Sequence, residues 1–549
     1  MKRKHSKYIL TLLATLICTV VFAQPDSLRK EVEVVKAYKP SVSDAYKINN
    51  IPKIEEARHQ KPTFDYSIFS QPVFSTFSVN TLQAAKITGK PSEDTGFGLL
   101  RLGAGNYSKP YIDFFFNNNK SKNTVFGLHF KHLSSHGKVK LEGGDKVKAP
   151  FSDNSAEMFV KRYFRKSALK AGLSFYRNAF NYYGYPEQPV PSVLLAGNQS
   201  VNLFNTKQAF SKGALNISLV NTSKSKNRPT FGFDLKYHYF STKSGQTEHL
   251  GDFAFHITKP VNNMTGILDA GGSFYLADNI INRATLLTGQ RQQMWMYAKP
   301  AIFMENDFAN FKAGGNIYFV LDKEDEAVLK FTPNVILNIT PVEGILSIFG
   351  GVDGKYEMNN YSKIAYLNPF VTPGHDVKNS FQQFRFFGGF DGKFSTKTNF
   401  KIAAEYTMVK GQPFFYLEEK APTPLSSTNL VVYNDFKILY DNMNLLKFNV
   451  EVFHAATGNF NLLLTGNYYV YEPETEVEAW NMPEFDAKLS LEYKVTEQLE
   501  VSSDIYLIGK RTGLIIYSPS RITGSATPLK KAMTLDTVFD LNVSGTYHF

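Results

Sequence analysis

Segments of about ten residues in which apolar and polar side chains alternate recur from residue 96 to the end of the chain, and this feature limits the possible folds most strongly. The alternation is clear in 231–239, 384–394, 400–408 and 485–495. Because successive side chains of a β-strand point to opposite faces, each segment predicts a strand with one apolar and one polar face. In 485–495, the register predicts that Leu489 and Leu491 face lipid while Lys488 and Glu492 face the interior.

A soluble β-sandwich and a membrane β-barrel both contain such strands. The apolar faces here consist mainly of Phe, Tyr and Leu, in a chain with 47 Phe and 30 Tyr. Short polar turns, such as 261–263 and 306–308, alternate with longer connections, such as 183–205 and 359–379. This asymmetry favours an all-β fold, a transmembrane antiparallel barrel with short periplasmic turns and longer external loops.

Composition excludes two other classes of protein. No stretch after the N-terminus has about 18 consecutive apolar residues, which excludes a bundle of transmembrane helices. A hydrophobic content of 43% is too high for a disordered chain. Counting the alternating segments predicts about 20 strands, with 18 to 22 tolerated, and an even number places both barrel ends on one side of the membrane.

The first 23 residues have the pattern of a cleaved secretory signal peptide. Four cationic side chains lie within Met1–Lys7, an apolar run covers 8–22, and Ala23 provides a small residue for cleavage. The residue before Cys18 is Ile17, which argues against lipidation. Cys18 is the only cysteine, so the mature chain is expected to lack thiols and disulfides.

Residues 24–95 differ from the barrel region, because they contain six prolines and little sustained alternation. We expect an extended periplasmic or lumenal segment, followed by the barrel at 96–549. Twenty strands would enclose a cylinder about 40 Å across, which wall side chains cannot fill. Inward loops or a partner protein could occlude it, and we expect residues 50–95 to lie at least partly inside.

Enzymatic motifs are absent, with no His-Glu-x-x-His, Gly-x-Ser-x-Gly, P-loop or EF-hand sequence. The stretch from His132 to His136 contains Ser134 and could belong to a lipase site, but the sequence places no Asn or Asp partner beside it. We therefore expect a polar cluster at a strand end, no enzymatic activity, and no metal or other cofactor.

The aromatic residues and basic charges are expected to face the membrane. Tyr237, Tyr239, Tyr468, Tyr469 and Tyr471, with Trp295 and Trp480, are predicted to form an interfacial girdle, although they could instead stack on sugars. Removing four signal charges from the net +12 leaves +8, scattered without a basic block. This distribution favours outer-membrane lipid and lipopolysaccharide as partners and does not predict a nucleic-acid partner.

The final strand resembles the β-signal that the barrel-assembly machinery recognises in outer-membrane proteins. Its outward face carries Phe539, Leu541, Val543, Tyr547 and Phe549. Gly545 lies among them, where an apolar side chain is more usual. The resemblance implies insertion into the outer membrane of a Gram-negative bacterium.

Near the N-terminus, Glu31, Val32, Glu33, Val34 and Val35 form a short strand-like segment that ends before Pro40. It resembles the TonB box of TonB-dependent receptors, although a strand docked on the barrel is an equally good interpretation. The chain as a whole, in particular 34–49 and 101–107, resembles a branch of these receptors, which implies an unknown solute and possibly TonB as partners. Residues 24–95 are shorter than the family's plug domain, so a passive porin and a scaffold for a partner complex remain alternatives.

Overall fold

The computed structural model describes residues 97–549, apart from 119–120, 122, 141–143, 145, 183–192, 196–198, 202–206, 222–227, 282–287, 323–326, 375–376, 420–435, 518–528 and 548–549. The chain divides into two units, Met1–Gly89 and Lys90–Phe549, and the described residues belong to the second. The predicted signal peptide, the 24–95 segment, the TonB-box-like residues and Phe549 lie outside the described residues.

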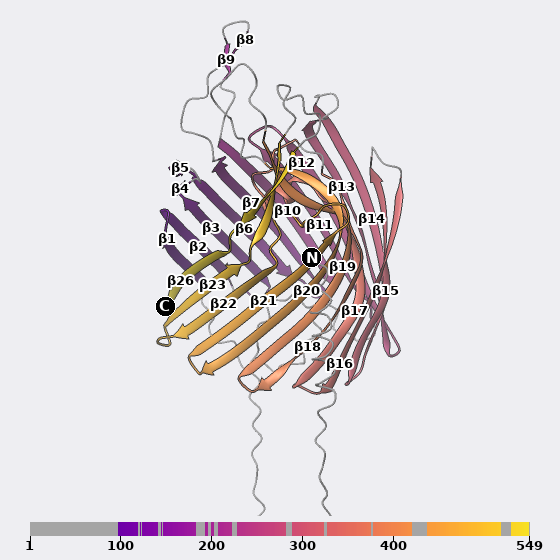
Figure 1. Ribbon diagram of the computed structural model, residues 1–549. Helices are drawn as coiled ribbons and strands as arrows, with labels where there is room; N and C mark the ends of the chain where they lie inside the picture. Colours follow the sequence, from indigo (N-terminus) through magenta and orange to yellow (C-terminus); the bar gives the residue numbers. More distant parts are fainter. Residues whose placement is uncertain are drawn as a thin grey trace, which may run out of the picture. The chain divides into compact units, whose positions relative to one another are not determined.

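Twenty strands follow one another around a barrel wall (Figure 1). They are β1 (Gly98–Gly105), β2 (Lys109–Asn118), β3 (Thr124–Ser135), β6 (Phe151–Tyr163), β7 (Ser167–Asn181), β10 (Lys207–Asn221), β11 (Thr230–Thr242), β12 (Thr247–Val261), β13 (Met264–Ile281), β14 (Thr288–Glu305), β15 (Ala309–Asp322), β16 (Val328–Val342), β17 (Leu346–Glu357), β18 (Ser380–Ser395), β19 (Thr398–Glu419), β20 (Phe436–Thr457), β21 (Phe460–Pro473), β22 (Phe485–Lys494), β23 (Leu499–Ile508) and β26 (Val538–Tyr547). The predicted number of strands is confirmed.

Each wall strand pairs antiparallel with the next wall strand along the chain. No ladder joins β1 to β26 among the described residues, so the barrel is nearly closed. Three hairpins extend beyond the wall: β4 (Lys138–Lys140) with β5 (Lys146–Lys148), β8 (Val193–Leu195) with β9 (Gln199–Val201), and β24 (Arg511–Tyr517) with β25 (Leu529–Leu535). Strand β24 also pairs in parallel with the end of β19.

The two ends of the barrel differ in the length of their connections. At one end, hereafter the turn end, two to eight residues join the strands; the other, the loop end, carries connections of up to 29 residues. Both β1 and β26 have their outer chain termini at the turn end, as an even number of strands requires. Four loop-end connections, 106–108, 243–246, 282–287 and 323–327, are also this short, so the predicted asymmetry does not hold for every hairpin.

The outward face of the wall is apolar and exposed, which is stable only against lipid. On β11, the side chains from Phe231 to Tyr239 that share this face are all substantially exposed. On β22, Leu489 is in register with the exposed Leu464, while Lys488 forms an ion pair with Asp504 on the opposite face. The predicted register of β22 is therefore confirmed. No helix among the described residues is long and apolar enough to cross a membrane.

The inward face carries a network of charged side chains. Arg385 on β18 donates to both carboxylate oxygens of Asp353 on β17, at 2.7 and 2.9 Å, and lies 3.4 Å from Glu405 on β19. Lys447 on β20 approaches the same Glu405 at 3.8 Å. These pairs link four consecutive strands on the side that faces away from lipid.

The predicted aromatic girdle is only partly correct. Tyr237, Tyr239 and Tyr468 are exposed on the outward face. Tyr469 and Tyr471 instead stack on each other on the inward face, with ring centroids 5.7 Å apart. Trp295 packs against the buried Tyr318, and Trp480 is buried in the connection after β21 with its Nε1 bonded to Glu476. The girdle assignment is wrong for these four residues.

Candidate functional site

The connection between β17 and β18 folds into the barrel at its loop end and carries the short helix α2 (Tyr361–Leu367). Tyr361 is fully buried and packs its ring against Phe210 of β10 and Phe240 of β11, each with centroids 6.1 Å away. Phe180 of β7 adds an edge-on contact to Phe210 at 5.3 Å. This aromatic cluster fixes α2 against the inner wall through the burial of its apolar face.

The first backbone N–H groups of α2 donate to the carboxylate of Glu248, a fully buried residue of β12. Tyr361 N donates to Glu248 Oε1 at 2.7 Å, and Ser362 N donates to Oε2 at 2.9 Å. The side chain of the N-cap residue Asn360 accepts from Lys363 N at 2.8 Å. All three groups would otherwise be unsatisfied at the helix start, so Glu248 anchors the helix to the wall and Asn360 caps it within the connection.

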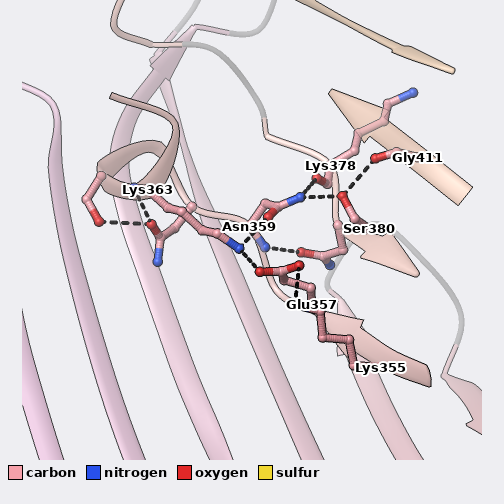
Figure 2. Close-up of polar contacts among 10 residues, drawn as sticks. Lys355, Glu357, Asn359, Lys363, Lys378, Ser380 and Gly411 are labelled. Atoms are coloured by element: carbon pink, nitrogen blue, oxygen red, sulfur yellow. Dashed lines mark hydrogen bonds and ion pairs between the residues drawn. The ribbon is translucent and has the colours of Figure 1, made fainter. Parts of the chain in front are cut away.

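A second set of polar contacts closes the base of this connection (Figure 2). Asn359 Nδ2 donates to the backbone oxygen of Lys378 at 3.0 Å and to Ser380 Oγ at 2.7 Å, which joins the two ends of the loop. Ser380 Oγ in turn donates to the backbone oxygen of Gly411 on β19 at 2.8 Å. On the other side of Asn359, Lys363 bonds Glu357 and the Asn359 Oδ1 atom. The loop is thus held at its base as well as at its helix.

Replacing Glu248 with alanine is expected to release α2 from the wall. The change leaves two buried N–H groups and the Tyr275 hydroxyl without their acceptor, at about 1–3 kcal/mol for each group. In a chain lacking residues 1–23, which contain Cys18, an Ala365→Cys substitution provides a single buried thiol. Its reaction with a maleimide should be at least about tenfold faster with Glu248→Ala than without it.

Glu497→Ala, at an exposed glutamate in the turn-end connection 495–498, is the matched control and should leave the labelling rate unchanged. Equal rates in the Glu248→Ala protein and the control would contradict the anchoring role of the carboxylate.

A cavity of about 620 Å³ lies between α2 and the inner wall. This volume suits a small organic solute. Wall and loop each contribute six residues: Asp153, Tyr176, Asn178, Phe210, Lys212 and Phe240 from the wall, and Asn360, Ser362, Lys363, Ala365, Tyr366 and Pro369 from the loop. We call this cavity the lumenal pocket.

The lumenal pocket offers groups of several chemical types. Lys212 makes no ion pair among the described residues, while Asp153 accepts from Tyr176 Oη at 2.9 Å and from Asn178 Nδ2 at 3.3 Å. The Oδ1 atom of Asn178 is buried and has no hydrogen-bond partner within the described part of the chain. The ring of Tyr366 is 80% exposed. A cation, a hydrogen-bond acceptor without a partner in the described part of the chain, and an exposed aromatic residue are groups that can orient a bound solute.

None of the residues singled out from the sequence as binding residues lines this pocket. Phe539, Leu541, Val543 and Tyr547 lie on β26, exposed on its outward face, and the TonB-box-like residues lie outside the described part. The sequence signal for the pocket was limited to the unusual length of 359–379. Among the described residues, no group of three or more His, Cys, Asp or Glu side chains has the arrangement of a metal site.

Comparison with known proteins relates the barrel to solved outer-membrane receptors. No protein-family model matches the sequence, and no curated protein matches it significantly. The ferripyoverdine receptor of the outer membrane of Pseudomonas aeruginosa aligns with 82% of this chain at a TM-score of 0.54 and 10% identity. This chain covers 65% of that receptor, slightly less than two thirds of its length.

The alignment with the siderophore receptor PirA from Acinetobacter baumannii covers 82% of this chain and 73% of PirA, at a TM-score of 0.56 and 9% identity. The alignment with the copper transporter OprC covers 82% of this chain and 72% of OprC, at a TM-score of 0.54 and 10% identity. The chain has the barrel fold of the TonB-dependent outer-membrane receptors. These neighbours are receptors and transporters, and at such low identity the likeness concerns the fold alone.

Proposed function

We propose that this protein is an outer-membrane receptor that binds a small solute in the lumenal pocket and delivers it across the membrane. The observation that carries the proposal is the pocket itself, which is lined by Lys212 and by Asn178, whose Oδ1 atom has no hydrogen-bond partner among the described residues. The receptor-like barrel supports the same conclusion. We place the loop end of the barrel on the outside of the cell, so a solute reaches the lumenal pocket from the exterior.

The pocket chemistry indicates the class of solute. The Lys212 ammonium favours an anionic group, and Asn178 Oδ1 favours a hydrogen-bond donor on the same molecule. The Tyr366 ring offers a flat surface for an apolar or ring-shaped part. We infer a solute of a few hundred daltons that carries both an anionic group and a donor.

Two further parts of the proposal concern partners. Residues Glu31–Val35 would add a strand to TonB, supplying the energy that a bound solute needs in order to leave the pocket. The outward face of β26 would be recognised by the barrel-assembly machinery during insertion, with lipid and lipopolysaccharide then surrounding the wall. The signal peptide at 1–23 would direct export and be removed.

The test is to purify the protein from native outer membranes and identify the small molecules that denaturation releases. The wild type is expected to carry an anionic solute, and Lys212→Glu should retain at least about tenfold less of it, since the new charge repels an anion. Lys494→Glu, at an exposed lysine near the turn end, is the matched control and should retain the wild-type amount. Correct folding of each variant is checked by heat-dependent migration on gels.

Equal retention in all three proteins would mean that the solute does not bind beside Lys212. A solute-free preparation that contains a stoichiometric partner protein would favour the scaffold alternative instead.

A further inference from the structure

A row of polar side chains crosses the outward face of the barrel near its loop end. His132 on β3 is in register with Asn154 on β6, Asn154 with Arg177 on β7, and Arg177 with Ser211 on β10. The outward row one step closer to the turn end contains the exposed aromatic residue Phe130. In the same register on β2 and β1 the outward residues are the apolar, exposed Ile112 and Leu102, so the row is polar from β3 to β10 but apolar on β2 and β1. We place this polar stretch at the edge of the apolar belt, near the lipid headgroups.

His132 and Asn154 of this row, together with Ser134 two residues further along β3, have the mutual geometry of a base, an orienting group and a nucleophile. His132 Nδ1 lies 2.7 Å from Asn154 Oδ1, and His132 Nε2 lies 3.1 Å from Ser134 Oγ. An amide oxygen can only accept, so Nδ1 must carry the ring proton, and Nε2 then accepts from the serine hydroxyl. Asn154 Nδ2 donates to Ser152 Oγ at 2.9 Å, which holds the amide in this orientation.

We propose that Ser134, His132 and Asn154 form a serine esterase site that hydrolyses carboxylic esters of phosphate-bearing lipids in the outer leaflet. The arrangement satisfies the geometric criterion for an activated serine: a base within hydrogen-bond reach of the hydroxyl and a third group that fixes the tautomer of the base. This activity is separate from solute binding, because the three side chains point outward whereas the lumenal pocket opens inward. An esterase activity also differs from the expectation, based on the sequence alone, that the protein has no enzymatic activity.

The chemistry balances with water as the only co-reactant. Ser134 Oγ attacks the ester carbonyl carbon while its proton passes to His132 Nε2. The bond to the lipid alcohol breaks, and the histidine returns the proton to the departing oxygen. Water then attacks the acyl-serine with His132 as base, releasing a fatty acid and restoring the serine. Asn154 stays neutral and keeps the histidine ring oriented.

Arg177 provides the preference for a phosphate-bearing lipid. Arg177 lies in the same row as His132, two strands away on β7, and donates from Nη1 to Ser211 Oγ at 2.9 Å. The remaining N–H groups can bind a phosphate oxygen, since guanidinium groups pair well with phosphate.

Ser134 is only 3% exposed in the structure, so reactivity of the hydroxyl and access of a bulky lipid are measured separately. The full mature protein is treated with diisopropyl fluorophosphate, a small serine-directed reagent, and the labelled residue is identified by mass spectrometry. The same protein is then placed in phosphatidylglycerol vesicles and, in a second arm, in vesicles containing lipopolysaccharide, and fatty-acid release is measured.

We expect fatty-acid release in at least one arm, and the active arm identifies the lipid class. Ser134→Ala and His132→Ala should each reduce release by roughly 1,000-fold or more, while Asn154→Ala should cause a smaller loss. Ser135→Ala is the matched control: it changes the adjacent serine, which points to the opposite face and bonds the backbone oxygen of Tyr107. It should retain wild-type release.

No release in either arm, or release that persists in Ser134→Ala, would overturn the proposal. Labelling of Ser134 by the fluorophosphate in a protein that also releases fatty acid supports the proposal. A protein that releases no fatty acid overturns it, whether or not Ser134 is labelled. Lys494→Glu, at the exposed lysine near the turn end, should leave fatty-acid release unchanged. Fatty-acid release and solute retention are separate measurements, so failure of the esterase site and failure of the solute site remain distinguishable.

Discussion

Leu489→Arg is expected to prevent most of the protein from inserting as a folded barrel. Leu489 is the fifth of the ten residues of β22, and its side chain lies on the lipid-facing side, in register with Leu464 and Ile505. A cation on the lipid face costs about 2–4 kcal/mol near the bilayer midplane. Such a cost is a large fraction of the stability of an ordinary fold. The measurement is the fraction of heat-modifiable, membrane-inserted protein.

Ser490→Arg is the matched control, because the adjacent side chain points inward. Ser490 donates to Asp504 at 2.5 Å, so an arginine introduced there meets a carboxylate rather than lipid. We expect near-normal insertion. Equal damage from the two substitutions would contradict the assignment of lipid-facing and inward faces on β22.

Replacing residues 359–379 with a short Gly-Ser linker is expected to raise the conductance of the purified barrel in planar bilayers. The segment places α2 and the buried residues Tyr361, Ile364 and Val371 inside the loop end, where they obstruct the lumen. Glu248→Ala should raise conductance less, since it frees the helix without removing it. A barrel that conducts equally well with the loop intact would favour the passive porin.

A deletion of residues 24–90 tests the sequence-based prediction that part of 50–95 occupies the lumen. If both segments obstruct the lumen, each change alone should raise conductance and the combination should raise it most. An effect of the loop replacement alone would show that the inward loop is sufficient to close the pore. The two changes therefore separate the contributions of segments far apart in the sequence.

The positions of the strands, and the face of the barrel wall to which each side chain points, were predictable from the sequence because both are local properties. The alternation in 485–495 determines which side chains share a face of β22, and the structure confirms it. The same rule shows why the girdle assignment was wrong at Tyr469. Tyr468 and Tyr469 are adjacent, so one must point outward and the other inward, and facing depends on parity rather than on residue type.

The two candidate sites depended on tertiary structure, because each combines residues that sequence spacing does not relate. Glu248 and Tyr361 are 113 positions apart and meet only because the β17–β18 connection folds inward onto the wall. The His132-x-Ser134 spacing was visible in the sequence, but its orienting partner was not. Asn154 lies 22 residues away and reaches His132 through the register of β3 with β6, which is set by pairing between strands and not by either strand alone.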